Sequence, residues 1–124
     1  MPVSLDYDDY DLGGMTSAAA GEAIPGADFV VLPTGSIEQH AEHLPVSVDT
    51  LRAEALTREL VEAASDHDLS MVRLPTLPYG YSEHHMRSPG TVTLGADTYR
   101  AVLTEIMRSV ADHGAERLAG VNCH

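Results

Sequence analysis

One short apolar segment, residues 28–33, limits the possible folds of this chain more than any other feature. It reads Asp-Phe-Val-Val-Leu-Pro and lies between Gly26 and the turn-forming residues Pro33 and Gly35. Its apolar side chains are consecutive rather than alternating, which is typical of a strand that is buried on both faces. A strand of this kind belongs to a sheet covered on both sides, as in α/β proteins.

Helical and extended segments alternate along the rest of the chain. Two helices are predicted at about residues 49–66 and 97–113, because apolar side chains recur three and four positions apart and Gly114 is suited to end the second helix. Further extended segments are predicted at residues 70–75, 91–94 and 117–122. This alternation favours right-handed crossovers and a mostly parallel sheet of about four strands. Because only two helices would cover that sheet, we expect exposed apolar surface and self-association.

Carboxylate and imidazole side chains gather in the loop that follows the first strand. Glu38 and His40 are separated by one residue, so in an extended chain both point to the same side and can hold one ion. The two oxygens of Asp49 could bridge two ions, although this residue could equally cap the helix that begins there. Functional groups in parallel sheets collect at the carboxyl ends of strands. We therefore expect residues 122–124 to meet this loop.

Other side chains near this loop have less direct roles. His43 is interpreted as a supporting or substrate-contacting residue rather than a ligand, and Glu42 as a solvated residue. Gln39 would face away from the two candidate ligands, where a hydrogen bond from its side chain would fix the loop. Ser36 lacks the Gly-x-Ser-x-Gly context of a nucleophile. Cys123 is interpreted as a small, half-buried residue beside the site.

A second loop, residues 76–91, carries the remaining candidate residues. It contains Tyr81, His84 and His85. Adjacent histidines in an extended chain point apart and cannot easily share one ion. We interpret the three residues as substrate contacts, or the histidines as an acid and a base near the mouth of a pocket. The alternative, two exposed loop histidines, has equal weight.

The charge of the chain excludes several classes of function. It has 19 acidic residues, 7 basic residues that are all Arg, and a net charge of -12. Nucleic acids and anionic membranes attract clustered positive charge, so we expect the chain to bind neither. An acidic chain without Lys is compatible with a halophilic protein, because high salt screens the repulsion between its acidic groups.

Other features of the composition concern the compartment. The single cysteine, Cys123, excludes an internal disulfide. No apolar run is long enough to predict a membrane span, and the acidic residues 1–12 lack the basic region of a signal peptide. We therefore expect a cytoplasmic protein whose N-terminal arm is mobile or docks on another surface.

Several segments of the sequence occur together in one order. They are Gly35-Ser36-x-Glu38-Gln39-His40, His43-Leu44-Pro45, Asp49, Tyr79-Gly80-Tyr81-Ser82, Pro89-Gly90-Thr91 and Asn122-x-His124. From about residue 28 to the last residue, this arrangement resembles the creatininase (creatinine amidohydrolase) family. The resemblance implies a three-layer α/β/α fold and two divalent ions, which are zinc, manganese or iron. Matched by position, the metal ligands would be Glu38, His40, Asp49 and His124, with Asp49 as the bridge.

The resemblance also implies a function. The family hydrolyses non-peptide C–N bonds, such as those of cyclic amides and formamides, with a metal-activated water, and its members form oligomers. Residues 28–124 would be an incomplete creatininase-like domain that follows an arm and first element at residues 1–27, because family members are considerably longer. The family usually has Gly where this chain has Cys123. The alternative is a truncated, non-catalytic metal-binding relative that needs a partner subunit or a missing C-terminal half.

Overall fold

The computed structural model describes residues 6–124 and contains, within that range, three parallel strands and three α-helices. The first five residues of the predicted N-terminal arm lie outside the described residues. The α-helices and strands are, in chain order, α1 (Ser17–Gly26), β1 (Phe29–Thr34), α2 (Val48–Asp66), β2 (Met71–Arg73), α3 (Ala96–Asp112) and β3 (Leu118–Asn122). Two single-turn 3-10 helices, η1 (Leu12–Gly14) and η2 (Glu83–His85), lie in the connecting segments.

Strand β1 is the centre of the sheet, whose strand order is β2-β1-β3. Val30 pairs with Val72 of β2 on one side and with Leu118 of β3 on the other, and both pairings are parallel. Val30, Val31 and Leu32 are all buried. The prediction of a strand with two buried faces is therefore confirmed.

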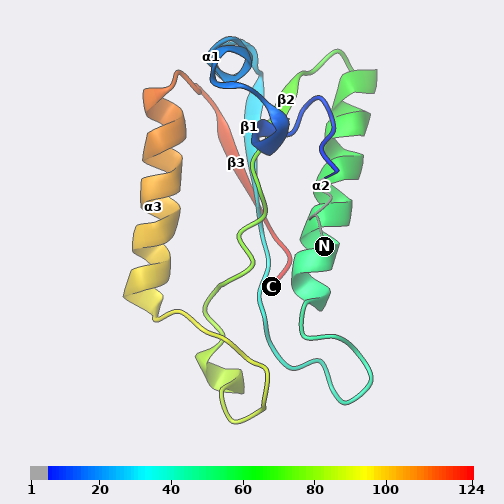
Figure 1. Cartoon of the computed structure of the whole chain (residues 1–124), viewed down its shortest axis with the longest axis vertical. Helices are drawn as coiled ribbons and strands as arrows, with labels where there is room; N and C mark the ends of the chain where they lie inside the picture. Colours follow the sequence, from blue (N-terminus) through cyan, green and yellow to red (C-terminus); the bar gives the residue numbers. More distant parts are fainter. Residues whose placement is uncertain (1–5) are drawn as a thin grey trace.

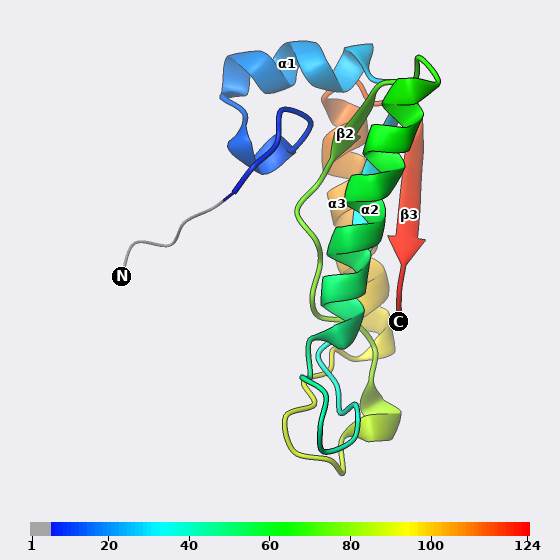
Figure 2. The ribbon, with the colours of Figure 1, turned by 90° about the vertical axis from the view of Figure 1, so that its right-hand side faces the viewer.

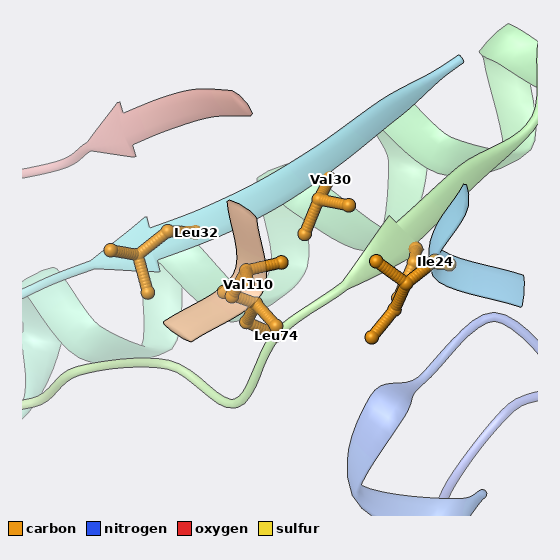
Figure 3. Close-up of a cluster of buried hydrophobic side chains, with 6 residues drawn as sticks. Ile24, Val30, Leu32, Leu74 and Val110 are labelled. Carbon is orange, nitrogen blue, oxygen red and sulfur yellow. The ribbon is translucent and has the colours of Figure 1, made fainter. Parts of the chain in front are cut away.

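Helices α2 and α3 lie on opposite faces of this sheet, which gives three layers (Figure 1). Val30 and Leu32 point to the face that α3 covers, where they pack in one buried cluster with Val110 (Figure 3). Val31 points to the other face because side chains alternate along a strand, and α2 packs there. The α/β/α arrangement expected from the sequence is present in the described residues.

Helix α1 was not predicted, and it lies across the end of the sheet opposite to the C-terminus (Figure 2). Its ten residues include two glycines and Pro25, which obscure a helical pattern. The Thr16 hydroxyl group accepts a hydrogen bond from the Ala19 backbone N–H at 3.1 Å and so caps its start. Ile24 inserts into the core beside Val30 (Figure 3).

The expected sheet of about four strands with two helices was wrong. Residues 91–94 form no strand. Within them, Val92 makes a single antiparallel bridge with Ile37. The third helix adds cover at one end, yet three leucines of α2 remain exposed: Leu51, Leu56 and Leu60. Exposed apolar surface is thus present among the described residues, and self-association stays a prediction. None of the helices in residues 6–124 has the length and apolar character needed to cross a membrane.

The described part of the N-terminal segment is docked on the fold. Asp11 forms a bridge with Arg73 at the edge of β2. Its carboxylate accepts a hydrogen bond from Arg73 Nε at 2.7 Å, and the side chains of both residues are only 4% exposed. Arg73 also donates to Glu54 of α2 at 2.9 Å. This buried ion cluster ties the segment to two elements of the core.

Candidate metal centre

Three segments that are distant in the sequence meet at the carboxyl ends of β1 and β3 (Figure 1). The loop after β1 supplies Glu38 and His40, the first turn of α2 supplies Asp49, and the residue His124 follows β3. The Asn122 side chain accepts hydrogen bonds from Thr34 and from the His124 backbone N–H, both at 3.1 Å. The geometry confirms the expectation that residues 122–124 meet the loop that follows β1.

A close approach of two backbones places the start of α2 against the end of β1. A Cβ atom on Gly35 would lie 2.5 Å from the Cα atom of Thr50, so glycine is required there. The Thr50 hydroxyl group donates to the Ser36 carbonyl at 3.0 Å and holds the two segments together. Asp49 is consequently directed toward the loop that carries Glu38 and His40.

Asp49 is the hub of the cluster and is almost fully buried. Its Oδ2 accepts a hydrogen bond from the Ser36 hydroxyl group at 2.7 Å and lies 3.2 Å from His124 Nδ1. Its Oδ1 lies 3.1 Å from His40 Nε2. The N-cap of α2 is Ser47, and Asp49 is the second residue of the helix, in its first turn, without a capping contact. The alternative that Asp49 merely caps the helix is therefore wrong.

The two imidazoles are oriented by backbone carbonyl groups. His40 Nδ1 faces the Glu38 carbonyl at 3.1 Å, and His124 Nε2 faces the Tyr81 carbonyl at 2.8 Å. A carbonyl oxygen only accepts hydrogen bonds, so each of these nitrogens carries a hydrogen. In the neutral tautomer, the other nitrogen of each ring directs a lone pair at a carboxylate. Metal-ligating histidines have this same arrangement.

Glu38 adds a second buried carboxylate beside His124. Its Oε1 lies 3.1 Å from His124 Nδ1, while its Oε2 is buried and has no hydrogen-bond partner within residues 6–124. A buried charged oxygen without a partner costs free energy unless a cation or a donor fills the space beside it. This orphaned oxygen is a direct sign that the cluster fits a cation.

The pKa values of two residues follow from this crowding. Burial works to raise the pKa of Asp49, but hydrogen bonding to Ser36, Glu38 and His124 and the charge of His40 lower it below its ordinary value. Burial works to lower the pKa of His124, but the Tyr81 carbonyl and the Glu38 and Asp49 carboxylates raise it. Both pKa shifts have the direction expected where an imidazole ring lies beside carboxylate groups.

Two overlapping groups have the geometry to hold an ion in residues 6–124. One contains Glu38, His40 and Asp49, and the other contains Glu38, His84 and His124. In each group, one ligand atom per residue lies within 4.8 Å of the others. Carboxylate oxygens with imidazole nitrogens are a donor set that suits zinc and other first-row divalent ions. The residues present therefore fit a divalent metal.

The other predicted residues take up different positions around this cluster. Gln39 donates to His85 Nδ1 at 3.2 Å and accepts from the Ala41 N–H at 3.0 Å, so it fixes the loop as expected. Tyr81 contributes its carbonyl to His124 and lines an open cavity of about 460 Å³ with His84 and His124. His43 is exposed and belongs to neither group.

Sequence reasoning missed the supporting residue Ser36. It is fully buried and was weighed only as a nucleophile, whereas its hydroxyl group holds Asp49. Its position directly after Gly35, where two backbones approach closely, was the available signal. It also missed that η2 turns the chain so that the His84 ring reaches the cluster.

The fold and the cluster define a class, namely α/β proteins with a carboxylate–imidazole centre at the carboxyl ends of parallel strands. Residues 13–124 match the family described as creatininase, creatinine amidohydrolase. The chain belongs to the creatininase family, so the resemblance seen in the sequence is confirmed.

Individual relatives agree with this assignment. The chain is 35% identical over 119 residues to a mycofactocin precursor peptide peptidase of Mycobacterium tuberculosis, covering 92% of this chain and 46% of the relative. It is 32% identical over 111 residues to a creatinine amidohydrolase of Pseudomonas putida, covering 86% and 39%. The chain thus spans about half the length of the curated relatives it matches, or less.

Solved structures show the same relation. A crystal structure of a creatinine amidohydrolase superposes with a TM-score of 0.82 at 30% identity, covering 93% of this chain and 45% of that one. A structure described as the manganese form of creatininase gives a TM-score of 0.84 at 29% identity, covering 94% and 46%. Another creatininase neighbour is described as the Zn–Zn type.

Proposed function

We propose that this chain is a metal-dependent amidohydrolase that cleaves a non-peptide C–N bond in a small amide, such as a cyclic amide or a formamide. The observation that carries the proposal is the convergence of Glu38, His40, Asp49 and His124 at one end of the sheet, with an orphaned carboxylate oxygen among them. Membership of the creatininase family supports the reaction class.

The ligands proposed for the metal are these same four residues. Asp49 has one oxygen near His40 and the other near His124, an arrangement that supports a bridging role between two ions. The manganese and Zn–Zn forms of neighbouring structures support a divalent metal. When bound, such an ion supplies Lewis acidity, which polarises an amide carbonyl and lowers the pKa of water toward neutrality.

The remaining residues would hold this centre and admit the substrate. Ser36 fixes one oxygen of Asp49, and the carbonyl groups of Glu38 and Tyr81 fix the two imidazole rings. The open cavity beside His124 has Tyr99 and Leu103 in its wall, and so provides an apolar surface on which a small amide can rest.

The proposal is tested with the chain first freed of metal by chelation. Zinc or manganese is added back, and hydrolysis is followed by chromatography on three probes: creatinine, an N-formyl amine and a short peptide. We expect metal-dependent cleavage of a non-peptide probe. We also expect Asp49→Asn to abolish it and the exposed Asp97→Asn, as a matched control, to leave it unchanged.

The other outcomes separate the alternatives. Cleavage of the peptide alone would favour a peptidase, which the 35% identity to the mycobacterial enzymes supports as the second candidate. Calorimetric binding of metal without hydrolysis of any probe would favour a non-catalytic relative that needs a partner subunit or further chain. If the chain binds neither zinc nor manganese, the proposed function is wrong.

A further inference from the structure

The short turn η2 places an additional imidazole beside the proposed ligands. His84 lies within η2, and its ring is stacked on that of His124, with ring centroids 6.0 Å apart and planes inclined by 25°. The interpretation that two adjacent histidines point away from one ion assumed an extended chain. The 3-10 turn removes that assumption, because it rotates successive side chains by about a third of a turn.

His84, His124 and Glu38 together form a group with a ligand atom from each within 4.8 Å of the others. Glu38 is buried, and its Oε2 has no hydrogen-bond partner within residues 6–124. The His84 ring makes no hydrogen bond in the same range, so its nitrogens are available. We propose that His84 is a metal ligand of this chain, and that it binds an ion together with Glu38 and His124.

The neighbouring residue His85 is held differently, which makes the assignment specific. The Gln39 side-chain amide donates to His85 Nδ1, so that nitrogen is an acceptor and the other one carries the hydrogen. His85 Nε2 lies 3.9 Å from Glu38 Oε2 and presents a hydrogen rather than a lone pair to it. On the side that faces the cluster, His85 therefore has no free nitrogen lone pair with which to bind a metal.

With His84 as a ligand, the proposed ligands divide between two ion positions. Glu38 belongs to both groups and has two oxygens, so it can serve an ion in each. Asp49 and His40 complete one group, and His84 and His124 complete the other. His84 and His124 also line the open cavity, so the second group faces the space that a small amide can enter.

The inference rests on the proposed metal dependence and is tested by binding rather than by turnover. The full chain, freed of metal, is titrated with cobalt(II), and the visible absorption band and the calorimetric affinity are recorded. For His84→Gln, we expect the affinity of one cobalt equivalent to fall by at least the roughly 10- to 100-fold that is typical when a supporting residue of a ligand is lost. The absorption spectrum should change with it.

Three matched variants accompany this measurement. His84→Glu restores a ligating oxygen and should recover most of the affinity, with a shifted spectrum. The exposed His67→Gln, at the end of α2, should retain the affinity and the spectrum of the unmodified chain. His85→Gln, on the same turn as His84, loses the contact with Gln39 but no proposed ligand, so it should lose less affinity than His84→Gln. Far-ultraviolet circular dichroism establishes that each variant is folded.

The outcomes that oppose the inference are distinct from those that oppose the proposed function. Unchanged cobalt affinity and spectrum in His84→Gln would overturn the role of His84 while leaving metal binding intact. An equal loss of cobalt affinity in His84→Gln and His85→Gln would also overturn it. Such a result would mean that the two histidines affect the ion only through the charge of the turn and not through ligation by His84. Absence of cobalt binding by the unmodified chain would instead contradict the metal dependence itself.

Discussion

The hydroxyl group of Ser36 is a single contact on which the orientation of Asp49 depends. The residue is fully buried and donates to Asp49 Oδ2 at 2.7 Å. Removing it leaves a buried carboxylate oxygen with one donor fewer, and carboxylates that ligate metals depend on such partners. We predict that Ser36→Ala lowers zinc affinity by about 10- to 100-fold, as measured by calorimetry.

A matched control exists on α3. The Ser109 hydroxyl group donates to the Glu105 carbonyl in an exposed part of that helix, so Ser109→Ala should not change the affinity. An affinity of Ser36→Ala equal to that of the unmodified chain would show that Asp49 is held without this hydrogen bond.

At the scale of single residues, the sequence predicted which side chains gather and not how they are held. The spacing of Glu38 and His40, and the position of Asp49 after the loop, were sufficient to select them. The buried support from Ser36 depends on a backbone approach between β1 and α2 that no local pattern encodes. The reach of His84 depends on a three-residue turn, and extended geometry was the wrong premise for it.

The contact between β1 and α2 depends on the absence of a side chain at Gly35. An added Cβ would lie 2.5 Å from Thr50 Cα and 2.6 Å from Thr50 N, so the backbone of α2 would have to move. We predict that Gly35→Ala lowers the free energy of unfolding by about 1–3 kcal/mol, as measured by urea denaturation.

Gly21 of α1 is the corresponding control, because an added Cβ there meets nothing within 4 Å. Gly21→Ala should stabilise the protein by up to about 1 kcal/mol, since alanine favours a helix more than glycine does. If both variants are equally stable, the close approach at Gly35 has no energetic importance.

A buried ion pair is one of the contacts that dock the N-terminal segment. Asp11 and Arg73 are each only 4% exposed, and removal of one partner leaves an uncompensated charge. We predict that Asp11→Ala costs about 3 kcal/mol of stability, measured by urea denaturation. Asp97→Ala, which breaks an exposed pair with Arg100, should cost less than about 1 kcal/mol. Equal costs would mean that Arg73 finds sufficient compensation in Glu54.

Elements with strong periodicity were predicted well, and weak ones were not. The two long helices and the three strands lie close to their expected positions. The spacing of their apolar residues indicates which segments are helical and which are buried strands. Helix α1 contains glycine, proline and alanine, and owes its position to contacts of Ile24 with the core. Residues 91–94 have strand-forming side chains, but they lie in a loop beside Ile37.

The net charge of -12 affects the whole molecule. Because all seven basic residues are Arg and the acidic residues are far more numerous, repulsion opposes the folded state at low ionic strength. We predict that the melting temperature rises between dilute buffer and molar KCl, where the screening length falls to about 3 Å. An uncharged solute at equal osmolality is the control. A melting temperature that is independent of KCl would rule out this electrostatic effect.

Strand β3 pairs with β1 alone among residues 6–124, and the chain leaves it directly into His124. Outer strands are the parts of a sheet that open most readily. A ligand bridging Glu38 and His124 would act as a crosslink between the loop after β1 and the residues that follow β3. Its binding free energy would oppose fraying of β3, and the exchange of β3 amide hydrogens with deuterium would slow in proportion to ligand occupancy.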